Sequence, residues 1–102
     1  MTTLHILNAA PTHNSQLTSC LRMVSSGDAI LLCGEAVQAL RVGSAAQQLL
    51  EKQPNYQLYA LQEDVEARGI DPADAAQLAL TLVDYPEFVA LTVKYTRVNS
   101  WT

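Results

Sequence analysis

The clearest structural signal in the sequence is the run Asp28-Ala29-Ile30-Leu31-Leu32-Cys33-Gly34. Apolar residues fill every position from 29 to 33, one carboxylate precedes them and a glycine follows. A strand of a parallel sheet is covered by helices on both faces, so it is apolar throughout instead of alternating. We therefore predict a buried parallel strand over residues 29–33 that ends at Gly34.

The segments before this run follow a strand pattern and then a helix pattern. Leu4-His5-Ile6-Leu7-Asn8 alternates and stops at Ala9-Ala10-Pro11, which indicates a first strand followed by a loop. The next helix can be capped by Asn14 or Ser15, and Ser25-Ser26-Gly27 ends it because glycine supplies the left-handed residue of a C-cap. One face of this helix is apolar, through Leu17, Cys20, Leu21 and Val24.

The segments after the run continue the alternation. The expected elements are a short helix over Glu35–Leu40, a break near Gly43, a helix over Ser44–Lys52 closed by Pro54-Asn55, a strand over Tyr56–Leu61, helical turns over Gln62–Arg68 ended by Gly69, and a helix starting at Asp71-Pro72. Residues 78–83 fit either a continued helix or a fourth strand, and we favour a strand over Leu80–Val83.

The last third of the chain predicts one more helix and one more strand. Asp84 and Glu87 resemble a capping pair, with Pro86 in the first turn. The helix that follows carries an apolar stripe of Phe88, Leu91 and Tyr95. Residues 97–101 could form a short edge strand.

This order of elements predicts an α/β fold. We expect residues 1–102 to form a single Rossmann-like domain, with a mostly parallel four- or five-stranded sheet and helices on both faces. Ligands of such sheets usually bind beyond the carboxyl ends of the strands. The loop Ala9–His13 and the turn at Gly34 would lie there.

Composition excludes several classes of protein. The 102 residues are 49% hydrophobic and 16% charged, which is typical of a globular domain. The net charge of -4 argues against direct binding of nucleic acid, which needs a cationic face. No apolar run approaches the ~20 residues of a membrane span, and no secretory signal pattern is present, so we expect a cytoplasmic protein. Two cysteines make no disulfide framework or zinc motif, and no phosphate-binding glycine loop occurs, so neither a metal nor a cofactor is expected.

Cys20 is the first candidate for chemistry. A reactive cysteine needs a thiolate, which a helix N-terminus or a nearby cation can stabilise. Cys20 lies beyond the first turn of its predicted helix, and Gln16, Leu17, Met23 and Val24 around it carry no charge. Residue chemistry therefore favours a small core side chain at this position.

The other candidates also have structural interpretations. Cys33, at the end of an apolar strand, is expected to be packing, and His13 to be a solvated loop residue. His5 is expected to be a hydrogen-bonded core residue. Glu63, Asp64 and Glu66 fit a solvated helix face. Trp101 is expected to dock on its own domain, with a partner surface as the alternative.

Several segments together resemble the TusB/DsrH family. Leu4-His5-Ile6-Leu7-Asn8 with Pro11 is similar to its "LHxxxxSP" opening, although Ala10 stands where Ser is usual. Residues 27–32 match its second strand. The further matches are residues 59–69 with "YALxEDxxARG", residues 84–94 with "DYxxFVxLTVK", and Ser100-Trp101 with the terminal Trp.

The resemblance implies a subunit of a heterohexamer with TusC/DsrF-like and TusD/DsrE-like partners. In the Tus branch, such a complex relays persulfide sulfur from TusA through TusD to TusE, for 2-thiolation of the tRNA wobble uridine. In the Dsr branch it handles sulfur in sulfur-oxidising bacteria. The persulfide cysteine of these complexes belongs to the TusD/DsrE-type chain. Many DsrH-like chains also carry a cysteine in the first helix, and Cys20 matches that position.

Two functions follow from this resemblance. The favoured one is a mainly structural and interaction subunit of a TusBCD-like relay, with Cys20 as packing. The alternative is a DsrH-type subunit of a sulfur-oxidation complex, with Cys20 as a catalytic persulfide carrier. A third possibility, a small ligand-binding α/β domain that uses the Ala9–His13 loop, is disfavoured.

Overall fold

The computed structural model describes residues 2–10, 16–41, 44–51, 56–75 and 78–101. In chain order, the elements formed by these residues are β1 (Thr3–Leu7), α1 (Gln16–Met23), β2 (Ala29–Leu32), the 3₁₀-helix η1 (Gly34–Leu40), α2 (Ala45–Glu51), β3 (Gln57–Leu61), α3 (Gln62–Ala67), the 3₁₀-helix η2 (Pro72–Ala75), β4 (Leu80–Val83), α4 (Tyr85–Lys94) and β5 (Arg97–Trp101).

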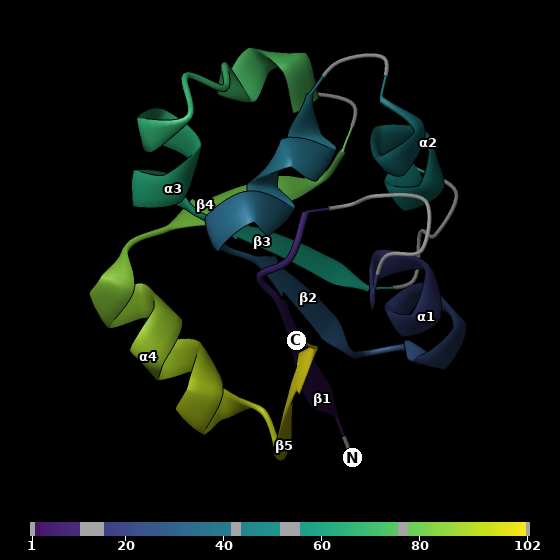
Figure 1. The fold of residues 1–102 in the computed structure, drawn as a ribbon. Helices are drawn as coiled ribbons and strands as arrows, with labels where there is room; N and C mark the ends of the chain where they lie inside the picture. Colours follow the sequence, from purple (N-terminus) through teal and green to yellow (C-terminus); the bar gives the residue numbers. More distant parts are fainter. Residues whose placement is uncertain (1, 11–15, 42–43, 52–55, 76–77, 102) are drawn as a thin grey trace.

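All five strands belong to one parallel sheet in the order β4-β3-β2-β1-β5 (Figure 1). β2 lies in the middle, paired with β1 from Leu4–Ala29 to Leu7–Leu32 and with β3 on its other side. All four of its residues are buried, which confirms the predicted doubly covered strand. The α/β prediction is confirmed, with five strands and helices on both faces.

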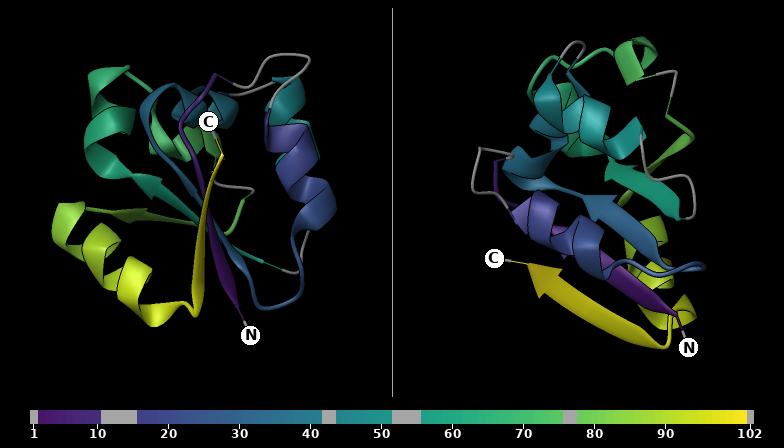
Figure 2. Two further views of the ribbon diagram at one scale, coloured as in Figure 1. Left: turned by 60° about the horizontal axis from the view of Figure 1, so that its bottom comes forward. Right: turned by 90° about the vertical axis from the view of Figure 1, so that its right-hand side faces the viewer.

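The path of the chain determines which helices cover which face. From β1 to β4 each strand is added on the same side of the one before, and α4 then carries the chain back to β5, beside β1. Right-handed crossovers in opposite directions place their helices on opposite faces. α1 and α2 accordingly lie on one face and α4 on the other (Figures 1 and 2).

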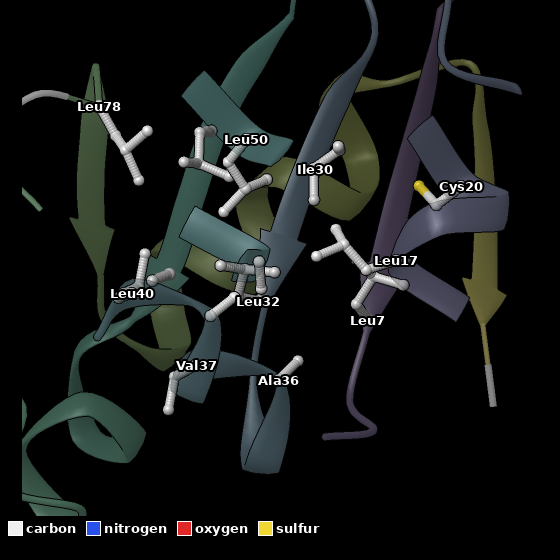
Figure 3. Close-up of a cluster of buried hydrophobic side chains, with 14 of the residues drawn as sticks. Leu7, Leu17, Cys20, Ile30, Leu32, Ala36, Val37, Leu40, Leu50 and Leu78 are labelled. Carbon is white, nitrogen blue, oxygen red and sulfur yellow. The ribbon is translucent and has the colours of Figure 1, made fainter. Parts of the chain in front are cut away.

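Each face has its own hydrophobic cluster. The larger one joins α1, η1 and α2 to the sheet, and Figure 3 shows Leu17, Cys20, Leu32, Leu40 and Leu50 within it. The smaller one lies under α4, with Leu91 and Tyr95 packed over the sheet. Its buried members are Leu4, Ala29, Leu31, Leu61, Val83, Leu91 and Tyr95.

Several predicted boundaries are confirmed and others differ. The strands over Leu80–Val83 and Arg97–Trp101 form as predicted, and Asp84 and Glu87 make a complete capping box for α4. Residues 34–40 and 72–75 are 3₁₀-helices where regular helices were expected. The predicted cap residues of α1, the break near Gly43 and the closure at Pro54-Asn55 lie outside the described residues.

The end of α1 needs a correction. Gly27 has the expected positive φ of 90°, but α1 ends earlier, at Met23. The N–H of Asp28 donates to the Ser25 carbonyl, and the Asp28 carboxylate accepts the Ser25 N–H. These two bonds close a separate turn, so Gly27 belongs to the entry into β2 and not to the helix cap.

α4, with ten residues, is the longest helix among those described. None of the helices in the described part of the chain combines the length and the apolar character needed to cross a membrane.

Candidate functional site

Cys20 lies on the inner face of α1 and is completely buried, with 0% of its surface exposed. The apolar spacing of the helix places it in the larger cluster beside Leu17 (Figure 3). Burial raises the pKa of the Cys20 thiol to about 12, and the negative charge of Asp28 adds to this effect. Since the thiolate is the nucleophile, Cys20 in this conformation has neither the charge nor the access that sulfur transfer requires.

Cys33 directly follows β2 and is half-buried at the carboxyl edge of the sheet. Its thiol donates to the Leu7 carbonyl over 3.5 Å and packs beside the smaller cluster. Burial raises the pKa of Cys33, and the charge of Asp64 adds to the shift. Cys33 is therefore the more accessible of the two thiols but is not activated.

A buried polar network lies at the other end of the strands, where sequence reasoning placed no site. The Asp28 carboxylate accepts the backbone N–H of Thr3 at 2.9 Å and of Ser25 at 3.0 Å. His5 Nε2 lies 3.2 Å from Asp28 Oδ2, and Trp101 Nε1 donates to His5 Nδ1 at 3.1 Å. The prediction of His5 as a hydrogen-bonded core residue is confirmed, and Trp101 docks on its own domain as expected.

Asp28 is the centre of this network and is only 5% exposed. Burial acts to raise its pKa, but the hydrogen bonds from Ser25, Thr3 and His5 outweigh burial and hold the pKa below its ordinary value. Asp28 is therefore a buried carboxylate that is charged and hydrogen-bonded. One feature of the sequence could have indicated this buried carboxylate: Asp28 is a single acidic residue directly before a fully apolar strand.

A cleft of about 260 Å³ opens over this network, between the end of α1 and strand β5. The cleft is lined by the buried pair His5 and Asp28 and by polar and cationic side chains from three segments. These residues are Thr3, His5, Met23, Ser25, Asp28, Arg97 and Asn99.

At the carboxyl ends of the strands, where a ligand site was expected, a hydrogen bond and an ion pair connect the α3 segment to the turn after β2. The Gly34 N–H donates to Asp64 over 2.7 Å, and Arg68 forms an ion pair with Glu35 at 2.7 Å. Asp64 is thus a half-buried anchor for the Gly34 turn, which corrects its interpretation as part of a solvated face. The reason is a contact across thirty positions of sequence, between α3 and the turn after β2.

The other half of the expected ligand site falls mostly on residues not described. His13 lies outside the described residues, as do all positions of the Ala9–His13 loop after Ala10. Among the residues with described positions, no group of three or more His, Cys, Asp or Glu side chains could hold a metal ion.

The family model and the similar proteins of known name point to the same family. The family model described as "DsrH like protein" matches residues 9–98. This chain belongs to the DsrH family. Protein TusB of Klebsiella pneumoniae (strain 342) is 37% identical to it over 100 residues, and Protein TusB of Serratia proteamaculans (strain 568) is 39% identical over 98 residues. Both matches cover 96% of this chain and 99% of the relative.

Solved structures share the architecture of this DsrH-family chain. The crystal structure of the ychN protein from E. coli superposes with a TM-score of 0.73 and 20% identity, covering 99% of this chain and all of that one. A protein of unknown function from Methanobacterium thermoautotrophicum gives a TM-score of 0.67 with 18% identity and 96% coverage of both chains. At this level of identity the likeness shows the fold alone.

Proposed function

We propose that this chain is the TusB-type subunit of a TusBCD-like sulfur-relay complex in the cytoplasm, with a mainly structural and interaction role. The observation that supports this most is the full-length match to Protein TusB at 37–39% identity. In the proposed heterohexamer, TusC/DsrF-like and TusD/DsrE-like subunits are the direct partners. TusA-like and TusE-like proteins exchange persulfide sulfur with the complex on its way to the tRNA wobble uridine.

The state of Cys20 favours the structural role over a carrier role. As a carrier, Cys20 would attack the outer sulfur of a donor persulfide as a thiolate, forming a Cys20 persulfide and releasing the donor thiolate. The enclosed side chain and the pKa of about 12 both oppose this step. The alternative, a DsrH-type subunit of a sulfur-oxidation complex with Cys20 as carrier, requires α1 to move away from the sheet.

The outer surface of α4 supports an interaction role. Tyr85, Val89 and Val93 follow one another at intervals of one helical turn and are 50%, 60% and 81% exposed. Val98 on β5 is also 44% exposed. A continuous exposed apolar stripe is more typical of a protein interface than of a free surface. We assign this stripe to a contact with a partner subunit.

Co-purification tests the proposal. The tagged chain is co-expressed with TusC-like and TusD-like proteins, and the complex mass is measured by light scattering after size exclusion. We expect Val93→Asp to reduce recovery of the partners by at least about tenfold, the equivalent of losing one apolar hot spot. Gln48→Asp, on the exposed side of α2 across the sheet, is the matched control and should leave recovery unchanged.

The possible outcomes distinguish a failure of the proposed complex from a failure of the α4 stripe as its contact surface. Failure of the unmodified chain to retain either partner would contradict the proposed function. Full recovery with Val93→Asp would contradict only the assignment of the α4 stripe.

A persulfide assay separates the two roles of Cys20. The purified complex is exposed to a persulfide donor, and the mass of this chain is measured in the unmodified, Cys20→Ser and Cys33→Ser forms. The structural role predicts no added sulfur at Cys20. One added sulfur that disappears only in Cys20→Ser would establish the carrier role instead.

A further inference from the structure

The hydrogen bond between Trp101 and His5 determines the protonation state of the imidazole. An indole N–H can only donate, so His5 Nδ1 must accept through its lone pair. The remaining proton of a neutral imidazole then lies on Nε2, where it is donated to Asp28 Oδ2. His5 is 3% exposed, so water does not replace either partner in this conformation.

A protonated His5 cannot make both contacts. Its Nε2–H would still point to the Asp28 carboxylate, and that contact would gain the attraction of opposite charges. Its Nδ1–H would point at the indole N–H, which places two donors against each other. We propose that His5 is a proton-sensitive latch, which holds Trp101 when neutral and releases it when protonated.

The side chain that the latch holds belongs to a strand at the edge of the sheet. β5 is an edge strand with one neighbour, β1, and its residues 97–100 are all exposed. The Trp101 ring is the one part of β5 that packs against the larger cluster, and its centroid lies 6.2 Å from that of His5. Loss of the indole bond therefore frees the Trp101 side chain, while the pairing of β5 with β1 and the contact of His5 with Asp28 stay in place.

Among the described residues around the imidazole, few groups carry charge. Asp28, before β2, is the anion, and Arg97 on β5 lines the same cleft as the cation. Burial raises the pKa of Cys20 on α1 to about 12. Burial and the hydrogen bond to Tyr59 raise the pKa of Tyr95, after α4, to about 12. Both groups stay uncharged near neutral pH, so Asp28 and Arg97 are the charged groups that act on the latch.

The single tryptophan of the sequence makes the latch directly observable. A ¹⁵N-labelled sample of the full chain gives one indole N–H signal, whose exchange with water is measured from about pH 8 to about pH 5, the range of histidine titration. After correction for the intrinsic pH dependence of exchange, we expect protection to fall about fivefold to tenfold, the equivalent of one neutral hydrogen bond. This loss should follow the titration of the His5 ring signals.

Two matched variants identify the responsible residue. The amide of Gln can accept from Trp101 but does not titrate, so His5→Gln should give protection that is independent of pH. His13→Gln removes the second histidine and should leave the pH dependence intact. In Asp28→Asn the carboxylate that attracts the protonated ring is gone, so release should move to lower pH.

Two results would overturn the latch. One is an indole N–H in the unmodified chain that stays protected down to about pH 5. The other is a His5→Gln variant that keeps the pH-dependent loss. The measurement on the unmodified chain does not depend on whether any variant folds.

Discussion

At the scale of single residues, Asp28 joins segments that are far apart in the sequence. One carboxylate satisfies the N–H groups of Thr3 and Ser25 and the imidazole of His5. These donors come from the start of β1, the turn after α1 and the middle of β1. His5 is buried and Thr3 is half-buried, so water does not readily replace the carboxylate there, and Asp28 fixes where β1, the turn after α1 and β2 meet.

Replacing Asp28 by Asn should reveal this role through pH. Because the pKa of Asp28 is lower in the folded chain than its ordinary 3.8, its stabilisation is complete above that value and is lost as the pH falls through the folded pKa. At neutral pH, Asp28→Asn should lower the free energy of unfolding by about 1–3 kcal/mol, because one oxygen cannot replace two. Urea unfolding at a series of pH values measures both effects. Equal pH dependence below 4 in the variant would contradict this account.

Cys20 offers a second test at this scale. A serine hydroxyl in the same apolar site has no described partner, so Cys20→Ser should cost about 1–3 kcal/mol of unfolding free energy. Cys33→Ser is the control, because the half-buried hydroxyl can still donate to the Leu7 carbonyl, and it should cost less than about 1 kcal/mol. Urea unfolding midpoints of the two variants measure the two losses of stability. An equal or larger loss for Cys33→Ser would show that Cys20 is not the better packed residue.

At the scale of elements, local signals were sufficient for most of the fold. The unbroken apolar run identified β2, the stripe of α1 predicted a buried Cys20, and Asp84 with Glu87 identified the start of α4. These signals involve neighbours within a few positions. The contacts of Asp28 with Thr3 and His5, of Asp64 with Gly34 and of Trp101 with His5 join residues 23 to 96 positions apart, and only the folded sheet brings them together.

The capping box gives a prediction for α4. Asp84→Ala removes the acceptor of the Glu87 N–H and should lower stability by about 1 kcal/mol. Asp84→Asn keeps an oxygen acceptor at the same place and should lose only a few tenths of that. Thermal unfolding of the two variants, followed by circular dichroism, provides the comparison. Equal losses would assign the effect to the charge of Asp84 and not to the cap.

The glycine in the turn after β2 gives another prediction about stability. Gly34 and Gly69 both have positive φ, 53° and 65°, so a side chain is strained at either position. A Cβ at Gly34 would also lie 3.3 Å from the Asn8 carbonyl oxygen, whereas the space at Gly69 is open. Gly69→Ala should therefore cost about 1 kcal/mol, and Gly34→Ala measurably more, in urea unfolding. A smaller loss at Gly34 would mean that the chain around Asn8 yields easily.

At the scale of the whole molecule, the two faces of the sheet are unequally covered. One carries α1, η1 and α2 over the larger cluster, whereas the other carries α4 over the smaller cluster, whose seven buried residues include Leu91 of α4 itself. The exposed valines of α4 lie on the less covered side. A small domain buries a modest fraction of its surface, so a partner that binds only the folded chain adds a large share of stability.

This inequality predicts strong stabilisation in the proposed complex. Partners at about 100 times the Kd contribute about 2.7 kcal/mol. For a domain of this size, that raises the Tm by about 10–20 °C. Differential scanning fluorimetry of the chain with and without TusC-like and TusD-like proteins measures the shift. Gln48→Asp on α2 should keep it and Val93→Asp should lose it, and an unchanged Tm at saturating partner would contradict the proposed contact.

The pairing of β5 with β1 affects how the protein is made. β1 pairs along its whole length with β5, a strand far later in the sequence, from Thr3–Arg97 to Leu7–Trp101. Until β5 has emerged from the ribosome, β1 therefore has a free edge of unpaired backbone groups. Such an open edge is the surface on which nascent chains associate with one another. The edge closes only when β5 has emerged from the ribosome, so slow synthesis or release of that segment would prolong the interval in which the newborn chain is most prone to aggregate.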